Sequence, residues 1–507
     1  METKQGTITL FACEQTSDMT VELPVEGDFT IPDYQAEIFK IVKTKAEPVV
    51  MGKLAVGNRA TVEGYVKLTV LYLSNEEARL CSMSQRIPFS KQFDLKEAVG
   101  ERYAISADVA VSYLNCRAVS ERRLDARGAL TISPKILSFK TVEAQGSLMG
   151  ENIFERSKTV ECTTLSRDAV KQFSIEELLS SDLPAGTAAT VIRCEARAVV
   201  DGAESFDNRV EVKGTVYVNV ALDLSGEAGL SVKRMGYKIP FTQVVDIEGV
   251  TAGETAIAEA YATSCTVLPE VTSEGMIEAT VALSLGVGIY DAKSAVILKD
   301  AFSTNYEMSL SSDVVSVMRA VIPVNTGFSF AESFDKPKGS LIDYFIQKSE
   351  LSLVREEEGA FLKTVAQLCC IFVDEEGETA SFDKQLEIRT AFSAQGANAA
   401  VYDLSAVFEN LECVEIGDKL SLKAGGTIVG RVSELEKVPV IRSARADETK
   451  PKQKPDAALF AYYAEVGEEV FDIARQFGAS PEEIMKENEI EDGALEYPAV
   501  LLIPIVE

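Results

Sequence analysis

The stretch RATVEGYVKLTVLY, residues 59–72, carries an apolar or glycine residue at every second position from Val62 to Tyr72. A period of two is typical of a half-buried β-strand, because successive side chains point to opposite faces of a sheet. The same pattern returns 150 residues later as RVEVKGTVYVNVAL, residues 209–222, with its glycine at the corresponding place. We therefore expect one such strand in each of two related segments.

The similarity between the two segments extends outward from this stretch on both sides. Residues 41–50 align with 191–200, and Ile87-Pro88-Phe89 recurs as Ile239-Pro240-Phe241. A more divergent third copy places apolar residues on the even positions of 360–372. The sequence thus predicts three repeats, at 1–150, 151–300 and 301–442.

Each repeat is rich in Val, Ile and Thr and is interrupted by glycine turn signals. This composition predicts mainly antiparallel sheet arranged as a sandwich. Short helices are expected near 34–41 and 175–179. The shared glycines Gly64 and Gly214 could mark a bulge or a close backbone approach. A strand position crowded by a neighbouring aromatic ring is preferred to a ligand contact.

Residues 458–507 follow a different pattern. Tyr462 to Ala464 form a strand candidate, and the apolar positions of 470–477 have the spacing of an amphipathic helix. Gly478 is a stop signal for that helix, and Ser480 can cap a second short helix that follows it. Because the apolar run 500–504 suits a buried strand, the predicted order is strand, helix, helix, strand.

A polar, proline-bearing segment, residues 443–457, lies between the repeats and this terminal module. Its composition predicts a semi-extended linker. The module is therefore expected to move independently of the repeats.

The predicted order, with Gly467, Asn488 and Tyr497-Pro498 in their places, resembles a LysM domain, a small α+β fold that binds peptidoglycan or chitin. In that family the glycan lies between the first strand-helix loop and the loop before the last strand. The resemblance implies a binding site made of Gly467, Glu468, Glu469, Val470, Glu489, Ile490, Asp492, Gly493 and Ala494.

The chain departs from the LysM pattern at two places. Glu468-Glu469 stands where family members usually carry Asp-Thr or Asp-Ser, and the usual Gly-Gln after Tyr-Pro is absent. The module also carries twelve Asp or Glu residues against Arg475 and Lys486, a net charge of about −10. Two interpretations remain open, namely a solvated acidic surface and a face that binds a basic protein partner.

Composition excludes several classes of function. A formal charge of −29 over 507 residues argues against nucleic acid as a direct ligand and against anionic membrane surfaces, and no direct insertion into a membrane is expected. The sequence contains no apolar run of transmembrane length and no signal-like start, so we expect the chain to remain where it is made. Nine cysteines without a C-x-x-C motif suit buried thiols in a reducing cytosol.

Histidine is absent from the sequence, which excludes Ser-His-Asp and Cys-His catalysis and most transition-metal centres. No phosphate-binding or dinucleotide-binding glycine motif is present, so neither a cofactor nor a metal site is expected. The acidic runs 356–358 and 374–376 each lie beside a glycine between predicted strands. We interpret them as solvated turns and expect no enzymatic activity.

Repeated β domains with the N-R-x-x-V-x-G and I-P-F features, followed by a LysM-like module, resemble the SPOCS-domain proteins of spore-forming Firmicutes. The resemblance implies a spore-coat morphogenesis factor of the mother-cell cytoplasm, located at the forespore surface. Its implied partner is the basal-layer ATPase or another morphogenetic protein of the coat, which it would bind as a scaffold. Two alternatives are a cell-wall protein that binds peptidoglycan or another GlcNAc-containing glycan, and a glycosidase that uses paired carboxylates.

Overall fold

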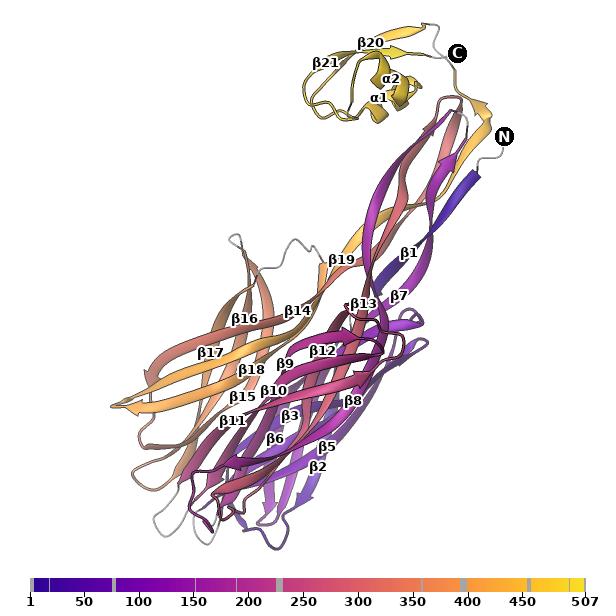
Figure 1. Ribbon diagram of the computed structural model, residues 1–507. Coiled ribbons are helices and arrows are strands. Elements are labelled where there is room, and N and C mark those ends of the chain that lie inside the picture. The colour runs from indigo at the N-terminus through magenta and orange to yellow at the C-terminus, as the bar shows by residue number, and fades with distance from the viewer. Residues whose placement is uncertain are drawn as a thin grey trace.

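The computed structural model describes residues 4–17, 19–74, 79–150, 152–187, 189–224, 231–356, 359–392, 399–453, 457–491 and 493–505. Over these residues the chain is mostly antiparallel β-sheet, and the described helices are two short ones near the C-terminus (Figure 1). The mainly β prediction is therefore confirmed. None of the described helices is long and apolar enough to cross a membrane.

The first repeat consists of two antiparallel sheets that pack face to face. One sheet has the order β3–β4–β5, and in the other the long strand β7 pairs with β1, β2 and β6. Val66 of β4 and Leu130 of β7 belong to the same buried core, which makes the pair of sheets a sandwich. The strands are β1 (Lys4–Gln15), β2 (Val21–Thr30), β3 (Ile38–Val56), β4 (Arg59–Ser74), β5 (Leu80–Asp94), β6 (Arg102–Ser120) and β7 (Arg123–Met149).

The second and third repeats have the same connectivity. Each contains a sheet of three consecutive strands, β9–β10–β11 or β15–β16–β17, and a second sheet centred on a long strand, β13 or β19. Their strands are β8 (Ile153–Ser180), β9 (Thr190–Phe206), β10 (Arg209–Asp223), β11 (Val232–Asp246), β12 (Thr255–Leu268), β13 (Met276–Ser303), β14 (Tyr306–Asp335), β15 (Ser340–Glu356), β16 (Gly359–Val373), β17 (Thr379–Phe392), β18 (Ala399–Ile416) and β19 (Lys419–Pro451).

The long strands continue beyond the sandwiches as three two-stranded ribbons, β1/β7, β8/β13 and β14/β19 (Figure 1). We call this bundle of ribbons the stalk. Its inward side chains form one core to which all three repeats contribute: Leu10, Ala12, Ala144, Val160, Cys162, Ala295, Ile297, Val315, Val317, Val438 and Val440. Because a two-stranded ribbon buries little surface by itself, each ribbon depends on the other two.

The two helices predicted within the repeats are wrong. Residues 33–35 form a turn, β3 begins at Ile38, and residues 175–179 lie inside β8. β3 has register shifts between Ile38 and Lys40 and again between Ile41 and Lys43. These bulges place apolar residues three apart in a strand, which is the spacing of a helix. In β8 the misleading spacing is four, which puts side chains on one face in a strand as well as in a helix.

The linker predicted at 443–457 is corrected over most of its length. Ser443 to Ala446 pair with β14, and β19 continues to Pro451, after which Lys452 N donates to Asn305 O at 2.8 Å. Ala444 is completely buried. The polar composition of this segment therefore reflects the exposed face of a stalk ribbon rather than a tether.

The interpretation of the shared glycines is confirmed. A Cβ added to Gly64 would lie 2.0 Å from Val49 O and 3.1 Å from the ring of Phe89. One added to Gly214 would lie 2.4 Å from the ring of Phe241. Each ring belongs to the residue directly opposite the glycine, so the conserved phenylalanine of the Ile-Pro-Phe motif covers a strand position that only glycine can occupy.

Candidate functional site

The terminal module has the predicted order of elements: β20 (Leu459–Ala464), α1 (Val470–Phe477), α2 (Pro481–Glu487) and β21 (Ala499–Pro504). Gly478 ends α1 in the left-handed conformation at φ 62°. Ser480 Oγ accepts from Glu483 N at 3.4 Å at the start of α2. Asn488 joins α2 to β21, because its Nδ2 donates to Leu502 O at 2.6 Å and its Oδ1 accepts from Leu502 N at 2.7 Å.

The structure brings together the two loops to which the sequence assigns a binding site. Gly467 N donates to Leu495 O at 2.9 Å and Val470 N donates to Gly493 O at 2.7 Å. Glu469 and Ala494 form an isolated β-bridge. The loops are therefore joined directly by backbone hydrogen bonds.

The predicted site residues differ in their accessibility. Val470 is buried in the core of the module, and Ile490 packs against that core. Glu468 turns back on its own loop, since its carboxylate accepts from Tyr462 Oη at 3.0 Å and from Glu465 N at 2.8 Å. Glu489, Gly493 and Ala494 are exposed, whereas Asp492 lies outside the described residues.

Glu469 takes part in an ion cluster that fixes the module to the tip of the stalk. Arg156 of β8 pairs with Glu469, and it also contacts Asp472 of α1 at 3.2 Å. Asp300 of β13 pairs with Arg475 of α1. Arg156 and Asp300 lie 3.6 Å apart, so acidic and basic groups alternate across the contact.

Aromatic rings fill the centre of this contact. The rings of Phe302 of β13 and Phe471 of α1 meet edge to face at 5.0 Å, and the ring centroids of Phe154 and Phe302 are 5.4 Å apart. The Arg156 guanidinium lies 4.9 Å from the Phe471 centroid. Phe302 belongs to the buried core of the module itself. The expectation that the module moves independently is therefore corrected, because it shares a core with the stalk.

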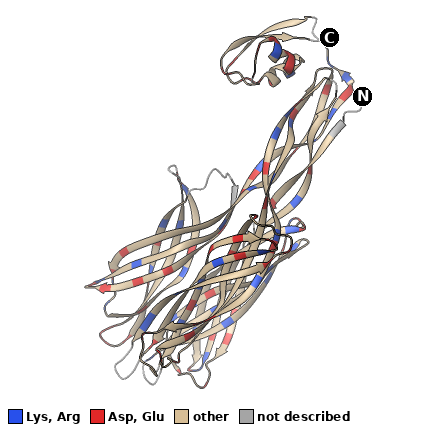
Figure 2. Cartoon of the chain, viewed as in Figure 1, with Lys and Arg blue, Asp and Glu red and all other residues tan. Residues whose placement is uncertain are grey.

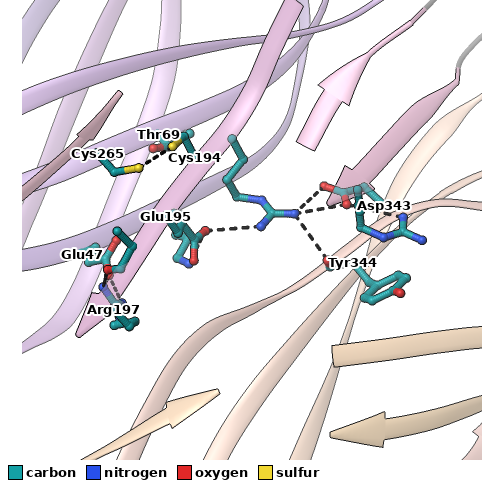
Figure 3. A network of polar contacts seen from close by, with 12 residues as sticks. Glu47, Thr69, Cys194, Glu195, Arg197, Cys265, Asp343 and Tyr344 are labelled. Atoms are coloured by element: carbon teal, nitrogen blue, oxygen red, sulfur yellow. Dashed lines mark hydrogen bonds and ion pairs between the residues drawn. The ribbon is translucent and has the colours of Figure 1, made fainter. Parts of the chain in front are cut away.

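A second polar cluster, which we call the repeat centre, lies where the three repeats meet (Figure 3). Lys45 pairs with Glu195 at 2.7 Å, and Arg193 pairs with Asp343 at 3.0 Å. The Arg193 guanidinium also lies 4.4 Å from the ring centroid of Phe345. Asp343 is fully buried, and Arg193 is 8% exposed. These residues come from β3, β9 and β15, the first strand of the three-stranded sheet in each repeat.

The members of this cluster occupy equivalent positions in the three repeats. Lys45 lies opposite Thr69, Glu195 opposite Asn219 and Phe345 opposite Cys369, partners that are 150 residues apart. Three identical charges at such a position would repel one another. Because the repeats belong to one chain, these positions have diverged to Lys, Glu and Phe, which contact one another favourably.

The ion pairs of this centre shift the titration of their members. Burial raises the pKa of Glu195, but the positive charges of Lys45 and Arg193 outweigh burial and bring it down to about 2. Burial lowers the pKa of Lys45 to about 8 in spite of Glu195. Both groups are charged at neutral pH, so the centre is an internally neutralised structural cluster.

Charged residues elsewhere are interspersed rather than gathered by sign, as Figure 2 shows along the stalk and the sandwiches. The acidic run at 374–376 is a turn, as predicted: Asp374 Oδ1 accepts from the backbone N–H of Glu376 at 3.0 Å and of Glu378 at 2.8 Å. Of the run 356–358, residues 357 and 358 lie outside the described residues. Among the described residues no group of three potential ligands is placed to hold a metal ion.

The fold and the repeat centre define a class of protein, in which several β-sandwich repeats of one chain pack against one another. A comparison with protein-family models matches the SipL, SPOCS-domain family over residues 37–119 and 188–268. These ranges fall on β3 to β6 of the first repeat and β9 to β12 of the second. The chain therefore contains two stretches of SipL-type SPOCS domain, which point to a role in sporulation. Neither the curated proteins nor the solved structures compared with it give a match.

Two features were missed from the sequence. The repeat centre was missed because charged residues in a strand usually lie on a solvated face; comparing positions 45, 195 and 345 in register would have shown complementary side chains. The stalk contact was missed because Arg156 and Asp300 are far from the module in sequence. Phe302, an aromatic residue in a polar stretch, was the available signal.

Proposed function

We propose that this chain is a non-catalytic scaffold in the assembly of the spore coat or envelope, and that its LysM-like module docks a coat protein. The SPOCS match supports the link to sporulation. The stalk core supports a scaffold role, because three interdependent ribbons form a stiff arm that carries the module at its end. Such an arm positions a bound partner at a fixed distance from the sandwiches.

The observation that carries the proposal is the outer face of the β20–β21 sheet. Tyr463 is 67% exposed and lies opposite Val500, which is 62% exposed. Leu459 and Leu502 continue the same face and are 49% and 37% exposed. An exposed strip of apolar side chains on a small module is typical of a protein-binding surface.

The charge of the module indicates what kind of partner fits this strip. The exposed acidic residues are Glu465, Asp472, Glu482, Glu487, Glu489, Glu491 and Glu496. A partner with apolar side chains flanked by Lys or Arg would complement both the strip and this charge. Within the proposal the partner is the basal-layer ATPase of the coat or another morphogenetic protein, met in the mother-cell cytoplasm at the forespore surface.

The alternative function is binding of peptidoglycan or another GlcNAc-containing glycan. It is favoured by the strand-helix-helix-strand order and by the two loops that lie side by side. Against it, Glu469 is engaged by Arg156 and Glu468 by its own loop. The protein-docking function is therefore the better supported of the two.

The proposal is tested by affinity capture from sporulating cells with the full-length protein, alongside sedimentation with purified peptidoglycan. We expect the full chain to retain a coat protein. In the sedimentation assay it should remain in the supernatant while the peptidoglycan pellets. The double substitution Tyr463→Ser with Val500→Ser should abolish capture.

A matched control is Tyr34→Ser, because Tyr34 is 86% exposed but lies in the first repeat. It should leave capture unchanged. Equal capture by the Tyr463/Val500 variant would reject the sheet face as the docking surface. Sedimentation of the full chain with peptidoglycan, without a captured coat protein, would favour the glycan-binding alternative.

A further inference from the structure

Two cysteines of the second repeat lie in contact. Cys194 is in β9 and Cys265 is in β12, and their Sγ atoms are 2.6 Å apart (Figure 3). β9 and β12 belong to different sheets of the same sandwich. None of the nine cysteines, all of which lie in the described part of the chain, forms a disulfide. The pair therefore links the two sheets by a thiol contact alone.

The surroundings of the pair make one of the two thiols accessible from a hollow and lower its pKa. Cys265 lines a hollow of about 240 Å³ together with Lys67 and Arg86, whereas Cys194 is 8% exposed. The hydrogen bond with Cys194 and the charge of Lys67 lower the pKa of Cys265. The same hydrogen bond and burial raise the pKa of Cys194. Cys265 is thus the nucleophile and Cys194 the resolving thiol.

We propose that Cys194 and Cys265 form an oxidation site at which a hydroperoxide, such as hydrogen peroxide, produces a disulfide between the two sheets of the second repeat. This inference is independent of the proposed docking function. It assigns a chemical reaction to a thiol pair that the scaffold role does not use.

The reaction is balanced in two steps. The Cys265 thiolate attacks one peroxide oxygen, so that an S–O bond forms, the O–O bond breaks and the second oxygen leaves as water after protonation. The Cys194 sulfur then attacks the Cys265 sulfenic acid, forming the S–S bond and releasing a second water that takes up the Cys194 proton. Two thiols lose two electrons in total, and one hydrogen peroxide becomes two waters.

The third repeat provides an internal comparison. Cys370 and Cys413 belong to the same buried core between the two sheets of their sandwich. They are 0% and 5% exposed, whereas Cys265 borders a hollow. Since peroxide must reach a thiolate, oxidation at Cys194–Cys265 is expected to precede oxidation at Cys370–Cys413.

The experiment treats the reduced full-length protein with hydrogen peroxide, blocks the remaining thiols with an alkylating agent and maps the peptides by mass spectrometry. The expected product is a Cys194–Cys265 cross-linked peptide pair, about 2 Da lighter than the two free thiol peptides together. Because the bond closes a loop between residues separated by 71 positions, the oxidised protein should also unfold at a higher temperature.

Two variants make the result decisive. Cys194→Ser should stop the reaction at a sulfenic acid on Cys265, which dimedone traps, whereas Cys265→Ser should give neither product at this site. Cys369→Ser, at a completely buried cysteine elsewhere, is the control and should leave the cross-link unchanged. Sulfinic acid on Cys265 in the wild-type protein, or both cysteines recovered only in the alkylated form, would overturn the proposal.

Discussion

The buried ion pair between Arg193 and Asp343 joins the second repeat to the third. Both side chains are almost fully buried, and Arg234 adds a second positive group 3.7 Å from Asp343. Removal of Asp343 leaves Arg193 charged in a poorly solvated place, with Glu195 at 3.4 Å as its remaining acidic partner. Asp343→Ala is therefore expected to lower the free energy of unfolding by about 3–5 kcal/mol, measured by urea denaturation.

Two further variants test whether the loss of stability comes from leaving a buried charge unpaired. The double substitution Arg193→Met with Asp343→Leu removes both charges and should cost less than Asp343→Ala alone. Glu378→Gln at the exposed Lys40–Glu378 pair should change stability by about 0–1 kcal/mol. A loss of similar size at both pairs would show that the repeat centre contributes no more than a surface ion pair.

Glu195 provides a prediction on pH. Its pKa falls from an ordinary value of 4.5 to about 2 on folding, so the unfolded chain binds more protons than the folded chain between these values. The stability that Glu195 contributes is complete above pH 4.5 and is lost as the pH falls towards 2. The difference in urea midpoint between wild type and Glu195→Gln should therefore shrink over this window.

Glu22→Gln, at an exposed position of β2, is the control for this measurement and should change the urea midpoint little. A difference between wild type and Glu195→Gln that stayed constant from pH 5 to pH 2 would contradict the assigned pKa.

At the residue scale, the sequence predicted some features and not others for physical reasons. The crowding of Gly64 and Gly214 was predictable because each repeat carries both the glycine and the phenylalanine that covers it. The roles of Lys45 and Glu195 were not, because an ion pair between repeats depends on how distant strands pack. No local pattern records that packing.

At the scale of single elements, the central strand β10 depends on its glycine to pair closely with β9 and β11. A methyl group on Gly214 would lie 2.5 Å from Val199 O and 2.4 Å from the Phe241 ring. Gly214→Ala is expected to lower the melting temperature, with a cost of about 1–3 kcal/mol from overpacking.

The same repeat contains a matched control in Gly286 of β13, because a Cβ added there meets no atom within 4 Å. Gly286→Ala should leave the melting temperature unchanged or raise it slightly. Equal losses in the two variants would mean that strand glycines act here through chain flexibility and not through contact with Phe241.

The elements themselves were predicted with uneven success. The four elements of the terminal module were found because capping and periodic signals agree within 50 residues. The helix predictions at 34–41 and 175–179 failed because a bulge or a four-residue spacing in a strand imitates helical periodicity. The stalk portion of β19 was mistaken for a linker because a ribbon packed on one side has a polar composition on the other.

At the scale of the whole molecule, the module is expected to stay on the stalk through the cluster around Arg156. Arg156→Glu would set a negative charge beside Glu469 and Asp472 and release the module. Trypsin cleavage after Lys452 should then accelerate about tenfold, equivalent to about 1.4 kcal/mol of lost contact energy. The charge-swapped pair Arg156→Glu with Glu469→Arg should restore slow cleavage.

Arg445→Glu makes the same charge change at an exposed position of β19 and serves as the control. Unchanged cleavage in Arg156→Glu would show that the aromatic contact between Phe302 and Phe471 is sufficient to hold the module.

The repeats were predictable from their 150-residue offset, but the shared stalk core and this docked module were not, since both arise from contacts between segments far apart in sequence.

The central claim is that the chain acts in sporulation by carrying its module to a coat partner. The most direct measurement is fluorescence localisation, in sporulating cells of the source organism, of the full-length chain and of the Tyr463→Ser/Val500→Ser variant, with protein levels matched. We expect a shell around the forespore for the full-length chain and diffuse mother-cell fluorescence for the variant. A shell of equal intensity for both would contradict it.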